Sequence, residues 1–246
     1  MQALRKQQIP RSKCPLGITT LVFFRKLFIR GDWQAVARPR TDDCCDSHGR
    51  TAVRSSIGMA RVKSPEKRAA ILRAAVRELA NSGLGAPTAK IAARAGVAAG
   101  TLFTYFPNKQ ALLNELYLEL KGEAYARVNA KFPGKGSLER RARHIWSSYL
   151  EWAIEFPEKR KVSVQLNVSD VITHDTREKT AAAGGAVRQT LSELDRRAAL
   201  RGLPAGFASA TMSALQEAAM EFVGREPRRR KHLMARGFQA FWRALR

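Results

Sequence analysis

Cysteine is nearly absent from this sequence, and its few copies lie near the start. Cys14, Cys44 and Cys45 are the three cysteines among 246 residues, so the chain after position 45 can form neither a disulfide nor a thiolate metal site. Adjacent cysteines seldom bind one zinc ion, and only His48 follows them closely. We predict no metal site and no cofactor.

Long apolar runs are missing as well. The longest candidate, residues 18–24, is far shorter than the roughly 20 residues that cross a bilayer. Arg25 and Lys26 interrupt it, and no small-residue cleavage site of a signal peptide follows. The sequence therefore predicts a cytoplasmic protein without a membrane segment.

Acidic residues are scarce, which gives the chain a strong positive charge. There are 21 Asp and Glu against 44 Lys and Arg, for a net charge of +23 and a pI of about 11.0. This balance excludes an acidic chain with cationic partners and favours polyanions, nucleic acid first and an anionic membrane surface second. Hydrophobic residues make up 45% of the sequence, which is enough for a folded core and excludes global disorder.

The first 58 residues differ from the rest of the chain. They hold 11 Lys and Arg and 4 Asp and Glu, a net charge of 11 − 4 = +7, and show no sustained helical or strand period. We expect residues 1–58 to be either a disordered basic tail or upstream sequence read from a misassigned start, with Met59 as the initiator. The remaining 246 − 58 = 188 residues carry a net charge of 23 − 7 = +16.

Three short helices are predicted between Ser64 and Phe106. Ser64 as N-cap, Pro65 in the first turn and Gly83 after the last turn bound the first helix, which carries an apolar stripe. A short second helix follows Thr88, with either Thr88 as N-cap or Ala86 as N-cap and Pro87 in the first turn. Gly96 ends it, and the third helix runs from Ala98 or Ala99 to about Phe106. Two short helices joined by a glycine turn form a helix-turn-helix, whose second helix enters the major groove of DNA.

A fixed pattern of residues runs through these helices. It comprises Ile91, Ala92, Ala95, Gly96, Val97, Gly100, Thr101, Leu102, Phe103, Tyr105, Phe106 and Lys109. This pattern resembles the DNA-binding region of TetR-family transcriptional regulators, over about residues 64–121. The resemblance implies a DNA-binding domain at residues 59–121, followed by a helical effector-binding and dimerisation domain at residues 122–246.

The resemblance also implies roles for individual residues. Ala99, Thr101 and Thr104 would face base edges, and Gly100 would let the DNA backbone approach closely. Phe103, Tyr105 and Lys109 would lie at the phosphates, and Thr88 would sit where the second helix meets the backbone. Tyr105 and Lys109 also have ordinary structural roles open to them, as a core-capping tyrosine and a solvated lysine at a helix start.

The third helix departs from the usual pattern. Ala98 replaces the common Ser or Thr cap, at a cost of about 1 kcal/mol, and Phe103 replaces a common Tyr. Residues 98–106 contain no Arg, Lys, Asn or Gln, so the strong bidentate readers of guanine and adenine are missing. We expect readout through Thr101, Thr104 and thymine methyl groups, with charge added by Lys90 and residues 61–63.

The rest of the chain reads as helical, so the predicted fold class is all-α. The expected helices run from about Lys109 to Lys131, then over Ser137–Phe156, Glu158–Val168, Thr176–Arg201, Ala205–Val223 and Pro227–Leu245. The last two carry broad apolar stripes, which fit either a homodimer interface, as in TetR-like proteins, or a monomer core. Six apolar residues fit either a ligand pocket for a small apolar effector or core packing, namely Trp146, Tyr149, Trp152, Phe156, Met212 and Met220.

These features predict a homodimeric, ligand-responsive DNA-binding regulator, more often a repressor than an activator, acting on a palindromic operator. The alternative is an architectural protein that coats DNA non-specifically through its charge. No catalytic constellation stands out after Met59, so we do not expect an enzyme.

Overall fold

The computed structural model describes residues 63–245, so the predictions for residues 1–58 and for Arg61 lie outside the described residues. Within residues 63–245 the chain forms α-helices, two short 3-10 turns and no strand, which confirms the all-α prediction. None of these helices is long and apolar enough to cross a membrane.

Helix α1, Pro65–Ser82, begins and ends where the sequence predicted. The Ser64 hydroxyl accepts a hydrogen bond from the Lys67 N–H (3.3 Å), which satisfies one of the free donors of the first turn. At the other end Gly83 adopts φ +73°, a conformation that favours glycine because it has no Cβ.

Helices α2, Thr88–Arg94, and α3, Ala99–Tyr105, form the predicted helix-turn-helix. Both frames proposed for the start of α2 were wrong by one residue. Pro87 is extended and occupies the N-cap position, with its carbonyl accepting the N–H of Lys90 and of Ile91. Thr88 is therefore already helical and does not cap the helix.

Helix α4, Lys109–Asn129, leads from this region into the C-terminal half. The next two helices, α5 (Leu138–Glu155, capped by Ser137) and α6 (Pro157–Asn167), lie within a residue or two of their predicted bounds.

The single long helix expected over Thr176–Arg201 was wrong. The chain forms α7, His174–Ala183, and α8, Gly185–Asp195, followed by the 3-10 turn η1, Ala198–Leu200. The break falls at Gly184, and the next residue, Gly185, has a φ of +41°, which is open to glycine and strained for other residues. Asp195 ends α8 and accepts the N–H of Gly206 and of Ala208 (both 2.8 Å), so it also satisfies donors at the start of the next helix.

The last two long helices are α9, Phe207–Arg225, and α10, Arg230–Ala244, with the 3-10 turn η2, Pro227–Arg229, between them. The sequence had placed their separation around Gly224. It lies instead at Glu226, one residue before Pro227, because proline disfavours helical backbone in the residue before it.

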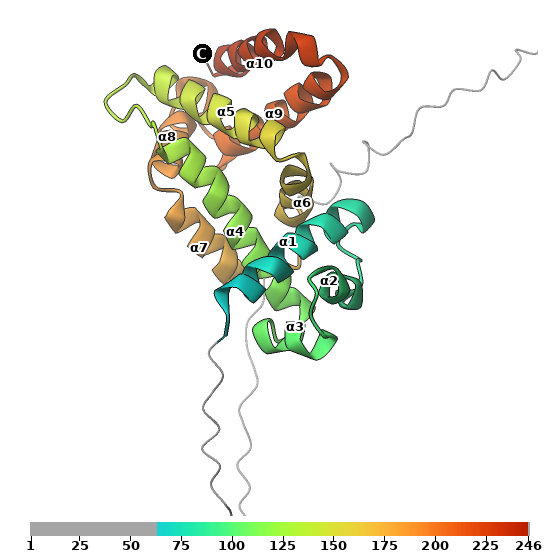
Figure 1. Cartoon of the computed structure of the whole chain (residues 1–246). Helices are drawn as coiled ribbons and strands as arrows, with labels where there is room; N and C mark the ends of the chain where they lie inside the picture. Colours follow the sequence, from blue (N-terminus) through green and yellow to red (C-terminus); the bar gives the residue numbers. More distant parts are fainter. Residues whose placement is uncertain (1–62, 246) are drawn as a thin grey trace, which may run out of the picture. The chain divides into compact units, whose positions relative to one another are not determined.

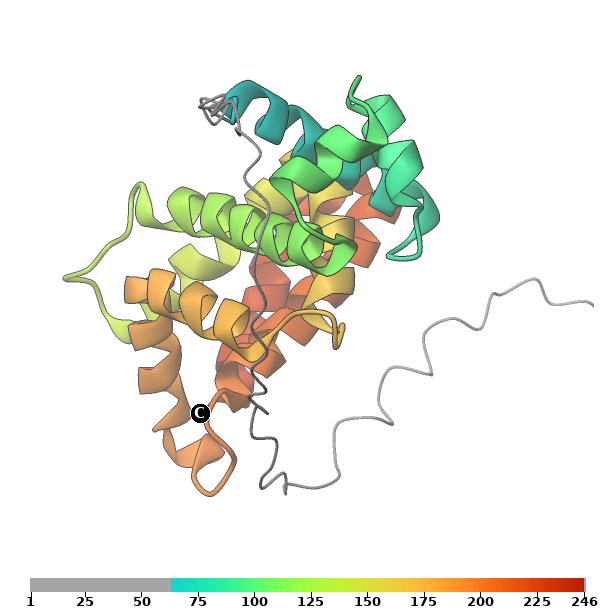
Figure 2. The ribbon, with the colours of Figure 1, turned by 90° about the horizontal axis from the view of Figure 1, so that it is seen from below.

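Figure 1 shows α3 at one end of the molecule and α10 at the other, with α4 running between the two ends. Helix α7 lies alongside α4 in this view and in the view from below (Figure 2).

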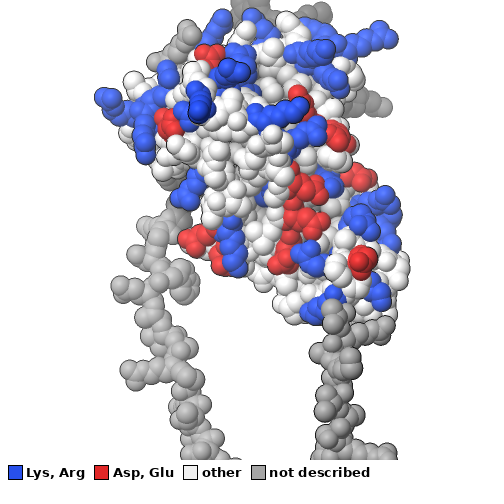
Figure 3. Space-filling view, turned by 60° about the vertical axis from the view of Figure 1, so that its left-hand side comes forward, with Lys and Arg blue, Asp and Glu red and all other residues white. Residues whose placement is uncertain are grey.

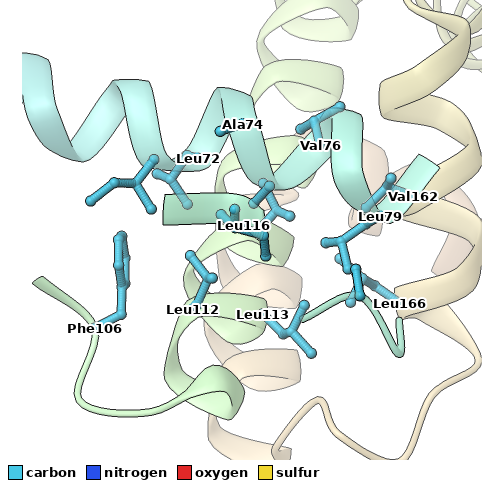
Figure 4. Close-up of a cluster of buried hydrophobic side chains, with 14 of the residues drawn as sticks. Leu72, Ala74, Val76, Leu79, Phe106, Leu112, Leu113, Leu116, Val162 and Leu166 are labelled. Carbon is cyan, nitrogen blue, oxygen red and sulfur yellow. The ribbon is translucent and has the colours of Figure 1, made fainter. Parts of the chain in front are cut away.

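We call the region that carries the helix-turn-helix the head (residues 64–121). Its apolar core is completed by residues from outside this region. Leu72, Leu79, Leu112 and other buried residues of α1 and α4 pack together with Val162 and Leu166 of α6 (Figure 4). Both α6 residues are fully buried. Helix α6 therefore belongs physically to the head as well as to the C-terminal half.

Candidate nucleic-acid interface

The turn between α2 and α3 holds the candidate recognition helix in place. Gly96 adopts φ +69°, and the Val97 N–H donates to the Ala92 carbonyl (3.0 Å). Val97 packs against the core of the head, and Leu102 anchors α3 from the other side with no exposed surface. The orientation of α3 is thus fixed by buried contacts, which leaves its other face open.

Every residue predicted to contact DNA keeps exposed surface. Ala99, Gly100, Phe103, Thr104 and Lys90 are exposed, and Thr88, Thr101, Tyr105 and Lys109 are partly exposed. The inward positions predicted for the same stretch, Leu102 and Phe106, are buried.

Gly100 is not required by the fold. Its φ is not positive, and a Cβ added at this position would meet no atom within 4 Å. Glycine inside a helix costs up to about 1 kcal/mol relative to alanine. Neither the backbone conformation nor packing inside the protein therefore requires glycine in the first turn of this exposed helix.

Thr104 has its hydroxyl partly committed. The Oγ1 donates to the carbonyl of Gly100 one turn earlier (3.1 Å). The oxygen can still accept a hydrogen bond, and the side-chain methyl group stays available for apolar contact.

Tyr105 is held by the start of α1. Its hydroxyl oxygen accepts the backbone N–H of Ser64 (2.9 Å), and its ring packs against the core of the head. The packing of the ring agrees with the alternative of a core-capping tyrosine, and the hydroxyl has a partner within the protein. The hydroxyl proton remains available as a donor, and the bond to Ser64 fixes where it can reach; sequence spacing alone gave no signal for this link.

Lys109 is the first residue of α4. Asn108 caps this helix by accepting the Ala111 N–H (2.8 Å), and the first turn of α4 contains no acidic residue. The partial positive charge of the helix start and the lysine ammonium thus act on the same side of the head.

Helix α3 has no charged residue, but exposed lysines lie on α1, on α2 and just before α1. Lys63, Lys67 and Lys90 are exposed. By contrast, Arg94 is paired with Glu78, and Arg68 is paired with Glu115 (2.6 Å). On the face drawn in Figure 3, Lys and Arg gather at the top and at the lower end, with acidic side chains between them.

The six residues predicted to line a ligand pocket fall into two neighbouring apolar groups. Trp146 and Met212 are buried in the core that α5 and α9 form with α10. Trp152 is buried with Ala124 and Ala153, and Tyr149, Phe156 and Met220 pack against that group while keeping some exposed surface.

Two hollows lie elsewhere on the surface. One of about 600 Å³ is bounded by α5 and α10, including Arg143, Ile154 and Lys231, and one of about 450 Å³ lies beside Tyr105 and Arg68. None of the six predicted pocket residues lines either hollow, so their assignment to a ligand site stays a prediction.

The head is tied to the α6–α7 loop by Asn114, a buried amide of α4. Its Nδ2 donates to the Val171 carbonyl (2.9 Å), and its Oδ1 accepts the Thr173 N–H (2.9 Å). This junction was not predicted, because the sequence gives no sign that the loop after α6 returns to α4.

Known proteins resemble the chain in this segment by sequence and over about 72% of its length by structure. Residues 71–116 match the sequence model of the bacterial regulatory proteins of the tetR family. A Shewanella sp. PV-4 protein assigned to the tetR family has a similar structure, with a TM-score of 0.64 and 28% identity over 72% of this chain and 97% of that one.

Two further structures share the fold at lower identity. The regulator LfrR of Mycobacterium smegmatis, solved in complex with proflavine, has a TM-score of 0.53 and 21% identity over 72% of this chain and 95% of its own. The regulator FadR of Bacillus subtilis, solved in complex with stearoyl-CoA, has a TM-score of 0.54 and 19% identity over 72% of this chain and 97% of its own. The helix-turn-helix, its sequence match over residues 71–116 and the shared helical architecture thus support a regulator of the TetR type.

Proposed function

We propose that the protein is a homodimeric transcriptional repressor that binds a palindromic operator and is released from it by a small effector. The observation that carries the DNA-binding part is the open face of α3. It presents Gly100, which the fold itself does not need, beside the exposed Phe103 and Thr104.

In this proposal α3 lies in the major groove, and phosphate contacts position it there. Lys109 and the Tyr105 hydroxyl lie at the phosphates, with Thr88 and Lys90 on the neighbouring helix. Ala99, Thr101 and Thr104 face base edges, and thymine methyl groups are their natural partners because no strong bidentate reader is present.

The outer face of α9 supports a dimer. Five of its residues fall on one side of the helix and are exposed in the single chain, namely Phe207, Ala210, Ala214, Ala218 and Phe222. Small residues flanked by two phenylalanines suit close packing against a second helix. We infer that α9 and α10 pair with the same helices of a second chain, which would set two recognition helices about 34–36 Å apart.

The effector would act through helices that belong to both halves. Helix α4 runs from the DNA-facing Lys109 to Ala124 in the apolar group around Trp152, and α6 contributes to the head core. A ligand that binds more tightly to a conformation with a different head spacing would shift the population away from DNA. The proflavine and stearoyl-CoA complexes of LfrR and FadR are consistent with an effector in this fold.

Selection of binding sites from random DNA, followed by titration of the selected duplex, tests the DNA-binding proposal. We expect a palindromic site preferred over random sequence by about a thousandfold or more. Lys109→Ala should weaken binding to all sequences and reduce the salt slope by about 1, whereas Lys131→Ala, an exposed lysine beyond the end of α4, should leave both unchanged.

The alternative function is non-specific DNA coating. It is compatible with α3, because this helix has none of the side chains that read guanine or adenine strongly. Binding that depends steeply on salt but shows no preferred sequence would establish that alternative and overturn the repressor proposal.

A further inference from the structure

Two cations without an acidic partner lie near Tyr117 and Asn167, one on α4 and one on α7, and these two helices pack together. Lys121 of α4 lies with its Nζ 5.3 Å from the centre of the Tyr117 ring. Arg177 of α7 donates to the backbone carbonyls of Asn167 (3.1 Å) and Ser169 (2.9 Å). Among residues 63–245 no carboxylate lies within ion-pair distance of either side chain.

This arrangement is unfavourable for the protein alone. Burial, together with the positive charge of Arg177, lowers the pKa of Lys121 to about 8. Yet the side chain keeps part of its surface open. A cation held in dense surroundings, near a second cation and still accessible, has the features of an anion site.

Apolar surface lies directly beside the cations. Ala124 follows Lys121 by one helical turn, so the two share a face of α4. Ala124 packs with Trp152, and Phe156 and Met220 lie against this group with part of their surface open.

Two buried donors on neighbouring helices lack a partner. The Nε1 of Trp152 on α5 and the Nε2 of Gln216 on α9 are buried and make no hydrogen bond among the described residues. Unsatisfied buried N–H groups are costly, so the packing of α5 and α9 around these two side chains is not optimal for the protein alone.

We propose that the effector is an amphiphile with one anionic group, which Lys121 and Arg177 bind while its apolar part packs against the partly exposed Phe156 and Met220. This inference rests on the proposed effector-responsive function and names the chemical class of the ligand. It refines the expectation of a purely apolar effector by adding a negative charge at one end.

Calorimetric titration in the absence of DNA tests this proposal. The probes are hexanoate, octanoate, decanoate and dodecanoate, the monoalkyl phosphates of the same lengths, and the matching alcohols. We expect at least one anion to bind about 10- to 100-fold more tightly than its alcohol, because a charge-assisted contact is worth that much. The two anion series distinguish a carboxylate head from a phosphate head.

Substitutions test whether Lys121 provides the positive charge that binds the anion. Lys121→Met should lose the preference for the anion, Lys121→Arg should keep most of it, and Lys131→Met, which removes an exposed lysine, should match the parent protein. Lys121→Met should unfold at the same or a higher temperature, because it removes a desolvated cation, so a loss of binding would not reflect a loss of folding.

Binding should also depend on pH with a definite sign. The Lys121 ammonium is charged below about pH 8, so above that pH the anion must bind together with a proton, and its affinity should fall by up to about tenfold per pH unit. Lys121→Arg should stay flat over the same range.

The nearby tyrosines do not titrate in the pH range in which anion binding is expected to weaken. Burial raises the pKa values of the nearby Tyr117, Tyr125 and Tyr149, which stay neutral over this range. Charged groups on the packed helices include Lys159 paired with Glu123 (2.7 Å), Glu193 paired with Arg141 (2.5 Å), Arg127 paired with Glu155 (2.9 Å), Lys179 paired with Asp175 (2.8 Å) and Arg160 paired with Glu217.

Alcohols that bind as tightly as the anions, anion binding unchanged in Lys121→Met, or no binding by any anion would each overturn the proposal. Because no DNA is present, these outcomes are separate from the repressor function. A protein that binds the anion through Lys121 but shows no operator preference would retain this site and lose the proposed regulation.

Discussion

At the scale of a single residue, Gly100 affects both the stability of the head and the proposed DNA interface. The folded chain has room for a methyl group at this position and no positive φ that demands glycine. The fold therefore does not require glycine at this position, and a substitution can separate folding from the proposed binding.

Gly100→Ala should raise the free energy of unfolding by up to about 1 kcal/mol, because alanine stiffens the helix without a clash. It should weaken operator binding by about tenfold or more, because the added methyl would hold the DNA backbone away. Chemical unfolding and DNA titration of the same protein check both effects.

Gly122→Ala is the matched control, since Gly122 is an exposed helical glycine of α4 with nothing within 4 Å of an added Cβ. It should stabilise the protein similarly and leave DNA binding alone. Undiminished operator binding by Gly100→Ala would mean that DNA does not approach α3 closely at this point.

At the scale of elements, α5 and α10 pack closely because one glycine of α10 leaves room for a tryptophan of α5. Trp146 of α5 is fully buried, and its Nε1 donates to the Met234 carbonyl of α10 (2.9 Å). A Cβ added at Gly237 would lie 2.8 Å from Cζ2 of the Trp146 ring, closer than real contacts allow. The spacing of these two helices therefore depends on Gly237.

Gly237→Ala should lower the free energy of unfolding by about 1–3 kcal/mol, because a buried ring and a helix must move apart. Urea unfolding measures this cost. Gly224→Ala, an exposed helical position of α9 with open space around it, should be neutral or slightly stabilising. Equal stability of the two variants would mean that α10 can shift on α5 at no cost.

The elements that local chemistry controls were predictable from sequence, and those controlled by distant contacts were not. Ser64, Gly83 and Gly96 act within one turn of chain, so the bounds of α1 and the turn before α3 followed from residue types. The break at Gly184 did not, because glycine is also tolerated inside helices and only tertiary packing selects the positive φ of Gly185.

The same distinction holds for the sites. The open face of α3 follows from helical spacing, so the exposure of Thr101, Phe103 and Thr104 was predictable. Lys121 and Arg177 come near each other because α4 packs against α7, and no local pattern marks two residues so far apart in the sequence as neighbours.

At the scale of the whole molecule, the head and the C-terminal half share buried surface. Val162 and Leu166 of α6 lie within the core formed by α1 and α4. We expect a fragment of residues 63–121 to lack a cooperative thermal transition, because it exposes the apolar side of α1 that α6 covers. Circular dichroism of the fragment and of residues 63–245 provides the comparison, and a sharp transition in the fragment would show that the head folds independently.

The shared core limits how far this regulator can be treated as modular. A chimera that exchanges the head at residue 121 would place a foreign α1 against Val162 and Leu166, and the mismatch would fall on the helix that links the two functions. Such a hybrid would keep both proposed binding sites and still fail to couple them. A working exchange would have to carry the inward face of α6 along with the head.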